Sequence, residues 1–273
     1  MSGWLALLCD GAPATAQDLA VPALLNDGHF STLQVRDGAA RGFDLHLQRL
    51  CDATRQLFDA ELAPARVRRD CAAALAAAGV RDATLRATVF RRPGTDAPSL
   101  LVSIAPPAEP PPLPLRLKSF GYVRALPGIK HVGTFPLFHH RRLAERAGFD
   151  DALFVAPGGH ICEATVWNLG FFGDDGVTWP QGPALRGVTE RLLQAGLDAA
   201  GVPQAARPVR LAEVGAFRGA FACNARGLQP VAAIDAVRYA RDDASLDAVA
   251  RALDAQPWQP IAAADAAAGE HGR

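Results

Sequence analysis

The chain has 273 residues, of which 49% are hydrophobic and 21% are charged, a composition that is ordinary for a globular protein with a core. This length exceeds one typical domain and suits two modest ones. The formal net charge is zero, so no overall positive field favours nucleic acid or an anionic membrane surface as a partner. No apolar run approaches the roughly twenty residues of a membrane helix.

The first part of the chain predicts strands, then two helices, then strands again. Asp37-Gly38 supplies a hairpin turn after the second strand. Asp44 is predicted as the N-cap of the first helix, because apolar residues recur at helical spacing from Leu47 to Phe58. The strands are expected at residues 5–9, 30–36, 84–90 and 99–105, and the second helix at residues 67–78.

A proline-rich segment, residues 106–114, divides the chain, because so dense a proline run cannot continue a helix or a central strand. We predict an N-terminal domain at residues 1–105, this linker, and a C-terminal domain at residues 115–273. In the C-terminal part, strands are expected near residues 115–120, 152–155, 161–165, 169–172, 177–179, 220–223 and 231–234, and helices at residues 137–147, 190–200 and 246–253. Strands mixed with helices in both parts predict an α/β (α+β) fold class.

The five cysteines are scattered, and none belongs to a CxxC pair. This spacing indicates neither a disulfide framework nor a zinc site. His139 and His140 are adjacent rather than four residues apart, so no HExxH-type metal site is predicted. We therefore expect free, buried thiols in a reducing cytoplasm and no metal.

Lysine is rare in this chain: Lys118 and Lys130 are the two lysines among 28 Lys and Arg residues. An ε-amine can lose its proton and condense with an aldehyde, which a guanidinium cannot do. Lys130 lies in the segment Pro-Gly-Ile-Lys-His-Val-Gly, and Glu163 follows 33 residues later. This context makes Lys130 the first candidate for chemistry.

Five short motifs follow one another along the chain. They are Asp27-Gly28-x-Phe30-x-Thr32, His46-Leu47-x-Arg49-Leu50, the Lys130 segment, Glu163-Ala164-x-x-x-Asn168-Leu169 and Leu185-Arg186-Gly187-Val188-Thr189. With this order and spacing the chain resembles the class IV aminotransferases, the fold-type IV enzymes that use pyridoxal phosphate, from about residue 25 to residue 234. These include branched-chain and D-amino acid aminotransferases and aminodeoxychorismate lyase. The resemblance implies a two-domain fold of the D-amino acid aminotransferase type, with the cofactor at the domain interface.

The same resemblance implies roles for the two central residues. Lys130 falls on the family's Schiff-base lysine, which also carries a proton during the reaction. Glu163 falls on the carboxylate that faces the cofactor's pyridine nitrogen and keeps it protonated. Lys118 does not fit the family's spacing and is expected to be structural.

The resemblance also implies residues that hold the phosphate. Arg49 matches the family's phosphate-contacting arginine, since a guanidinium grips phosphate oxygens in pairs. Gly187, Val188 and Thr189 open a helix whose free N–H groups favour an anion. Asn224 and Ala225 match the last cofactor loop. The candidates for contact with the substrate are Phe30, Thr32, Arg124 and Arg226.

One departure from the family affects the reaction type. Branched-chain enzymes carry Tyr five residues after the lysine, where this chain has Phe135. The lyase branch also lacks that Tyr and shares the Gly-x-Lys-His context, so Phe135 weakens the branched-chain assignment and leaves the cofactor in place.

Three functions therefore remain open for a cytoplasmic homodimer. The first is amino transfer between an amino acid and a 2-oxo acid. The second is a lyase-like β-elimination that releases pyruvate. The third is a non-catalytic binding module on the same fold. Nucleic acid and membrane are not expected among the partners.

Overall fold

The chain forms two compact units, Met1–Ala108 with Pro257–Arg273 and Glu109–Gln256. The computed structural model describes residues 3–262 of these units. Within that range no helix is both long enough and apolar enough to cross a membrane.

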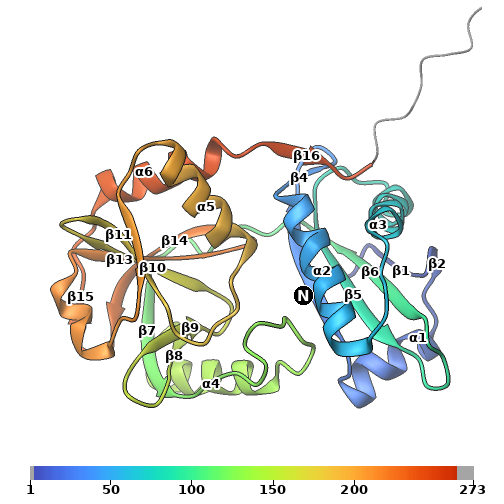
Figure 1. The fold of residues 1–273 in the computed structure, drawn as a ribbon, viewed down its shortest axis with the longest axis horizontal. Helices are drawn as coiled ribbons and strands as arrows, with labels where there is room; N and C mark the ends of the chain where they lie inside the picture. Colours follow the sequence, from blue (N-terminus) through green and yellow to red (C-terminus); the bar gives the residue numbers. More distant parts are fainter. Residues whose placement is uncertain (1–2, 263–273) are drawn as a thin grey trace, which may run out of the picture. The chain divides into compact units, whose positions relative to one another are not determined.

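The first unit is built on an antiparallel five-stranded sheet (Figure 1). Its strands are β1 (Ala6–Cys9), β2 (Ala12–Pro13), β3 (His29–Val35), β5 (Ala83–Arg91) and β6 (Pro98–Ala105). Their order in the sheet is β2-β1-β6-β5-β3. The register sets Leu33 opposite Leu85 and Leu85 opposite Ile104, so apolar residues line up across one face. The first two strands are followed by the short helices α1 (Ala16–Ala20) and η1 (Val21–Leu25), which the sequence did not predict.

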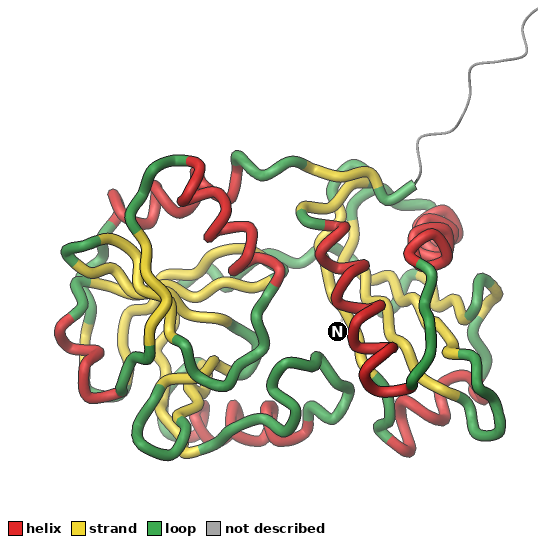
Figure 2. The backbone as a smooth tube through the Cα atoms, in the orientation of Figure 1, coloured by secondary structure: helices red, strands yellow, loops and turns green. Residues whose placement is uncertain are grey.

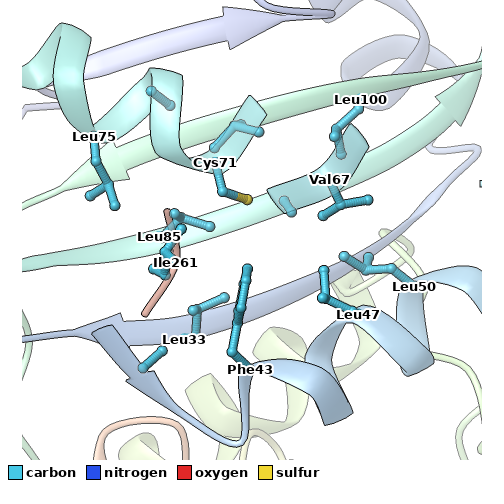
Figure 3. Packing of buried hydrophobic residues seen from close by; sticks show 14 of the residues in the cluster. Leu33, Phe43, Leu47, Leu50, Val67, Cys71, Leu75, Leu85, Leu100 and Ile261 are labelled. Carbon is cyan, nitrogen blue, oxygen red and sulfur yellow. The ribbon is translucent and has the colours of Figure 1, made fainter. Parts of the chain in front are cut away.

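Two helices cover this apolar face. They are α2 (Phe43–Phe58) and α3 (Pro64–Ala78). Phe43 and Leu47 of α2 and Val67 and Cys71 of α3 pack with the strand residues in one core (Figure 3). The other face of the same strands therefore carries the alternate residues, since successive side chains of a strand point to opposite sides.

The start of α2 differs from the prediction. The helix begins at Phe43, and its N-cap is Gly42 in the left-handed region at φ 63°, not Asp44. Asp44 is instead engaged by a distant segment: its backbone N–H donates to Gln259 Oε1 at 3.0 Å, and its carboxylate accepts from Gln259 Nε2 at 2.9 Å. Glycine adopts this cap conformation without the strain that a Cβ atom would bring.

The segment around Gln259 corrects the predicted extent of the second domain, which ran to residue 273. Strand β16 (Trp258–Pro260) pairs with β4 (Ala39–Arg41) of the first unit. Ile261 is fully buried in the core of that unit. The chain therefore returns after residue 256, because an apolar residue and a short strand find partners there.

The second unit contains a nine-stranded mixed sheet in the order β12-β11-β10-β13-β14-β7-β8-β9, with β15 paired to β14. The strands are β7 (Leu115–Gly121), β8 (Asp151–Val155), β9 (Ile161–Ala164), β10 (Asn168–Gly173), β11 (Gly176–Pro180), β12 (Gln204–Arg207), β13 (Gly219–Asn224), β14 (Gly227–Ile234) and β15 (Val237–Arg238). Strand β7 runs parallel to both β8 and β14.

Helices pack on this sheet at separate places. They are α4 (Phe135–Arg146), α5 (Val188–Ala199), the 3₁₀ helix η2 (Leu211–Ala216) and α6 (Asp243–Asp254). Leu193 of α5 and Val249 of α6 share a core with Phe221 of β13, whereas Leu137 and Ala144 of α4 pack on Phe154 of β8. A long loop, residues 122–134, joins β7 to α4 (Figure 2). This loop carries Lys130.

Candidate active site

The loop of residues 122–134 holds Lys130 in a defined place. Lys130 is half-buried, and its neighbours Ile129 and Val132 are buried. The loop turns at Leu126, which has a φ of 46°, and the N–H of Ile129 donates to the carbonyl of Leu126 at 2.8 Å. The buried side chains and the turn together anchor the lysine on an ordered segment.

Glu163 lies in the second unit with Lys130, on the short strand β9. All four residues of this strand are buried, and Glu163 is 7% exposed. Burial raises the pKa of the Glu163 carboxyl above its usual value, because the charged form loses its hydration. The positive charges of Arg124 and Lys130 oppose this shift. The two residues predicted to carry the chemistry are thus brought close enough to interact.

Arg124, predicted as a substrate contact, is buried among groups of the chain itself. It is 5% exposed, and its Nε lies 3.3 Å from Glu163 Oε1. Its Nη2 donates to the carbonyl of Pro127 at 3.0 Å. The first anionic partner of this guanidinium is therefore a carboxylate of the chain itself.

The contact between Arg124 and Glu163 leaves hydrogen-bonding capacity unused. The distance is that of an ion pair, yet among residues 3–262 both Arg124 Nε and Glu163 Oε1 are buried atoms with no hydrogen-bond partner. The Nε–H bond is therefore not aimed at the carboxylate oxygen. Since buried polar atoms are rarely left unsatisfied, Glu163 Oε1 is an acceptor that a ligand donor can use.

Asn168 shapes the start of α5. Its Nδ2 donates to the carbonyl of Leu185 at 2.6 Å, and its Oδ1 accepts from the backbone N–H of Gly187 at 3.2 Å. A Cβ atom on residue 187 would lie 2.3 Å from that same Oδ1, so the close approach requires glycine. The first N–H groups of α5, from Val188 on, then have no acceptor within the helix and favour an anion.

Replacement of Asn168 by alanine is expected to lower the free energy of unfolding by roughly 1–3 kcal/mol, because the carbonyl of Leu185 and the N–H of Gly187 lose their partner. Urea unfolding of the full chain measures this change. Gln181→Ala is the control: residue 181 is exposed, and its loss is expected to cost less than about 0.5 kcal/mol. Equal stability of the two variants would contradict the positioning role of Asn168.

The turn after β13 is joined to the start of α5. Thr189 Oγ1 donates to the carbonyl of Asn224 at 2.8 Å, and Asn224 Nδ2 donates to the carbonyl of Val166 at 3.2 Å. The contact between Thr189 and Asn224 therefore brings the segment of residues 187–189 next to the turn that carries Asn224 and Ala225. Because the Thr189 hydroxyl donates to protein, an anion here would meet chiefly backbone N–H groups.

Arg226 follows this turn. Its backbone N–H donates to Asn224 Oδ1 at 2.7 Å, and its guanidinium lies 5.9 Å from the centroid of the Trp167 ring. The residue is exposed. Arg226 is thus a cation beside the predicted phosphate loop, in the second unit.

In the first unit, Arg49 of α2 is held by two buried side chains. Its Nη2 donates to Ser31 Oγ at 2.5 Å and lies 3.2 Å from His46 Nδ1. Ser31 Oγ and His46 Nδ1 are 2.7 Å apart. The sequence motifs contained both partners without identifying them, since Ser31 is an unspecified position between Phe30 and Thr32.

Phe30 and Thr32 lie on the sheet face opposite α2 and α3, together with an arginine that the sequence analysis missed. Arg86 lies opposite Thr32, and its guanidinium is 3.7 Å from the centroid of the Phe30 ring. Burial lowers the pKa of Arg86 to about 10. Its Nε donates to Thr88 Oγ1, and it forms no ion pair with any residue in the described part of the chain. The sequence signal that could have placed Arg86 on this face is its alternation with Leu85 and Ala87, which point to the core.

Comparison with known proteins identifies the family. The family described as amino-transferase class IV matches residues 28–234. The chain belongs to this family. The match contains the five motifs except for Asp27, the first residue of the first motif, and confirms the resemblance. No curated protein matches the chain.

Solved structures of class IV aminotransferases and their relatives share the fold. A hypothetical aminotransferase from Mycobacterium tuberculosis, in a PLP-bound form, is 24% identical, with a TM-score of 0.79 over 93% of this chain and 98% of that chain. The branched-chain amino acid aminotransferase of Escherichia coli is 15% identical, with a TM-score of 0.79 over 91% and 92%. The 4-amino-4-deoxychorismate lyase of Pseudomonas aeruginosa is 26% identical, with a TM-score of 0.77 over 91% and 98%. The predicted fold-type IV architecture is thereby confirmed.

The residues of this class IV chain fit pyridoxal phosphate. Glu163 Oε1 is a buried acceptor of the kind that a protonated ring nitrogen would need, and the start of α5, next to the Asn224 turn, has N–H groups that favour an anion. Lys130 supplies an amine within electrostatic reach of Glu163. Each group that the cofactor needs in the second unit is therefore present.

Proposed function

We propose that the chain is a pyridoxal-phosphate-dependent aminotransferase that transfers an amino group between an amino acid and a 2-oxo acid. The observation that carries this proposal is the pair of Lys130 and Glu163, an amine and a buried carboxylate with an open acceptor atom, in a chain of the class IV family. The proposal includes a homodimer in the cytoplasm. Five free, buried cysteines agree with a reducing compartment.

Each residue has a separate task in this proposal. Bound pyridoxal phosphate would supply an electron-accepting ring when the Cα–H bond of the substrate breaks. Lys130 Nζ holds the cofactor and then takes the Cα proton. The Glu163 carboxylate binds the ring nitrogen and keeps that nitrogen protonated. The backbone of residues 187–189 binds the phosphate, with Asn224 and Ala225 beside it.

The substrate carboxylate needs a cation that the protein has not already neutralised. Arg124 is engaged with Glu163, so we assign this task to Arg226, which follows the Asn224 turn in the same unit as Lys130 and Glu163.

The second candidate is a β-eliminating lyase that releases pyruvate. Phe135, at the start of α4, favours it, because this residue lacks the hydroxyl of the Tyr that branched-chain enzymes carry there. The third candidate, a binding module without catalysis, requires that Lys130 and Glu163 have no chemical use.

Product analysis separates the three candidates. The purified full chain, loaded with pyridoxal phosphate, is incubated with a panel of amino acids and one 2-oxo acid, and separately with 4-amino-4-deoxychorismate alone. A new amino acid in the first reaction supports amino transfer. Pyruvate in the second, with no amino acceptor present, supports the lyase. Failure to bind the cofactor would support the binding module.

Arg49→Gln is expected to raise the dissociation constant of pyridoxal phosphate about 10- to 100-fold, because a charged hydrogen bond to the phosphate contributes roughly 1.5–3 kcal/mol. Titration with pyridoxal, which has no phosphate, should show no such change. Arg55→Gln is the control on the same helix, since Arg55 pairs with Glu61 at 3.0 Å. Equal weakening of both ligands would exclude a phosphate contact for Arg49.

A further inference from the structure

Arg124 links the loop of Lys130 to the strand of Glu163. Within the loop, its Nη2 donates to the carbonyl of Pro127, three residues ahead. Across the unit, its Nε lies 3.3 Å from Glu163 Oε1. A single buried side chain thus joins the two segments that hold the proposed catalytic pair.

The electrostatic surroundings of Glu163 give this link a consequence. Burial disfavours the ionised carboxylate, and the charge of Arg124 is the largest influence in the opposite direction. A protonated Glu163 would be a poor partner for a protonated ring nitrogen, because it carries no negative charge to stabilise that nitrogen. The titratable or charged side chains that interact with Glu163 are Arg124, Lys130, Arg186, Tyr122 and Cys162.

We infer that Arg124 is a positioning residue that holds Glu163 as a carboxylate and ties it to the loop carrying Lys130. The inference rests on the proposed function. It proposes that Arg124 acts on Glu163, in place of the contact with the substrate that the sequence predicted. Glu163 Oε1, a buried atom with no hydrogen-bond partner among the described residues, is then the acceptor for the ring nitrogen.

The sign of the pH effect follows from charge. Removal of the positive charge at residue 124 raises the pKa of Glu163 further. When the pH is lowered, the carboxylate of the variant therefore becomes protonated at a higher pH than that of the wild type. Any binding that depends on the carboxylate is then lost at a higher pH.

The test measures the affinity of the full chain for two probes between pH 5.5 and 8.5. One probe is pyridoxal phosphate, and the other is its carbocyclic analogue, in which a CH group replaces the ring nitrogen. For Arg124→Gln we expect about tenfold weaker binding of pyridoxal phosphate at neutral pH and an acid midpoint about one pH unit higher. Binding of the analogue should not change. Arg124→Lys retains the charge and should restore most of the affinity.

A double-mutant cycle keeps the inference testable if the unpaired carboxylate of Arg124→Gln prevents folding. Arg124→Gln added to Glu163→Gln should leave the ratio of the two affinities unchanged, because no carboxylate remains to be held. Equal weakening of both probes by Arg124→Gln, or no weakening, would overturn the inference and leave the proposed function intact. A wild-type chain that binds neither probe would overturn both.

Discussion

Replacement of Lys130 by alanine is expected to abolish turnover, with a loss of about 10⁴-fold or more. The variant lacks the amine that holds the cofactor and the base that takes the Cα proton, and general base catalysis alone contributes about 10²–10⁴-fold. The measurement combines steady-state rates with borohydride reduction of the cofactor-loaded protein and peptide mapping. The wild type should yield one reduced adduct at Lys130, and the variant should yield none.

Lys118→Ala is the matched control, because the chain contains two lysines. Lys118 lies on β7, and its Nζ is 2.8 Å from Asp235 Oδ1. The Lys118 amine is thus already engaged with a carboxylate of the chain itself. This variant should keep its activity and its reduced adduct. An adduct at Lys118, or an active Lys130→Ala, would show that the motif alignment has the wrong lysine.

The residues proposed to carry the cofactor chemistry could be predicted from the sequence because each stands in a short local motif. Lys130, Glu163 and the Gly187 to Thr189 segment depend on chemistry that few residue types supply. The family match over residues 28–234 confirms the resemblance built on them. Most strands and helices followed from alternation and helical spacing in the same local way.

Contacts between segments that are far apart in the chain could not be predicted from the sequence. Gln259 binds Asp44 across 215 residues, and this contact gives Asp44 a partner other than the helix N-terminus. Arg124 was predicted as a substrate contact because its charge was visible, whereas its proximity to Glu163 depends on how the loop and β9 fold together. Arg86 was passed over because strand alternation places it on a face that the sequence alone does not assign.

The same long-range contacts explain why the sequence leaves the reaction type open. Phe135 agrees with more than one reaction, and Arg226, the cation proposed for the substrate carboxylate, is exposed beside the Asn224 turn. The shape of these surfaces, rather than the motif residues, decides which substrate is accepted.

Replacement of Glu163 by glutamine is expected to slow Cα deprotonation about 10²–10³-fold while cofactor affinity falls far less. Glutamine has nearly the same shape but cannot hold a negative charge against the ring nitrogen, and removal of one preorganised electrostatic partner typically costs this much. The rate is measured with an amino acid that the wild type accepts and with its Cα-deuterated form. A larger isotope effect in the variant would place the slow step at Cα.

The close contact with Arg124 requires a control for this variant. Glu163→Gln leaves a buried arginine without its carboxylate, and an uncompensated buried charge is itself destabilising. Arg124→Gln combined with Glu163→Gln removes that charge. If loss of the carboxylate slows the reaction, the double variant should regain stability and remain slow. Recovery of the rate would assign the defect to the unpaired arginine, and an unchanged rate in Glu163→Gln would remove Glu163 from the ring-nitrogen role.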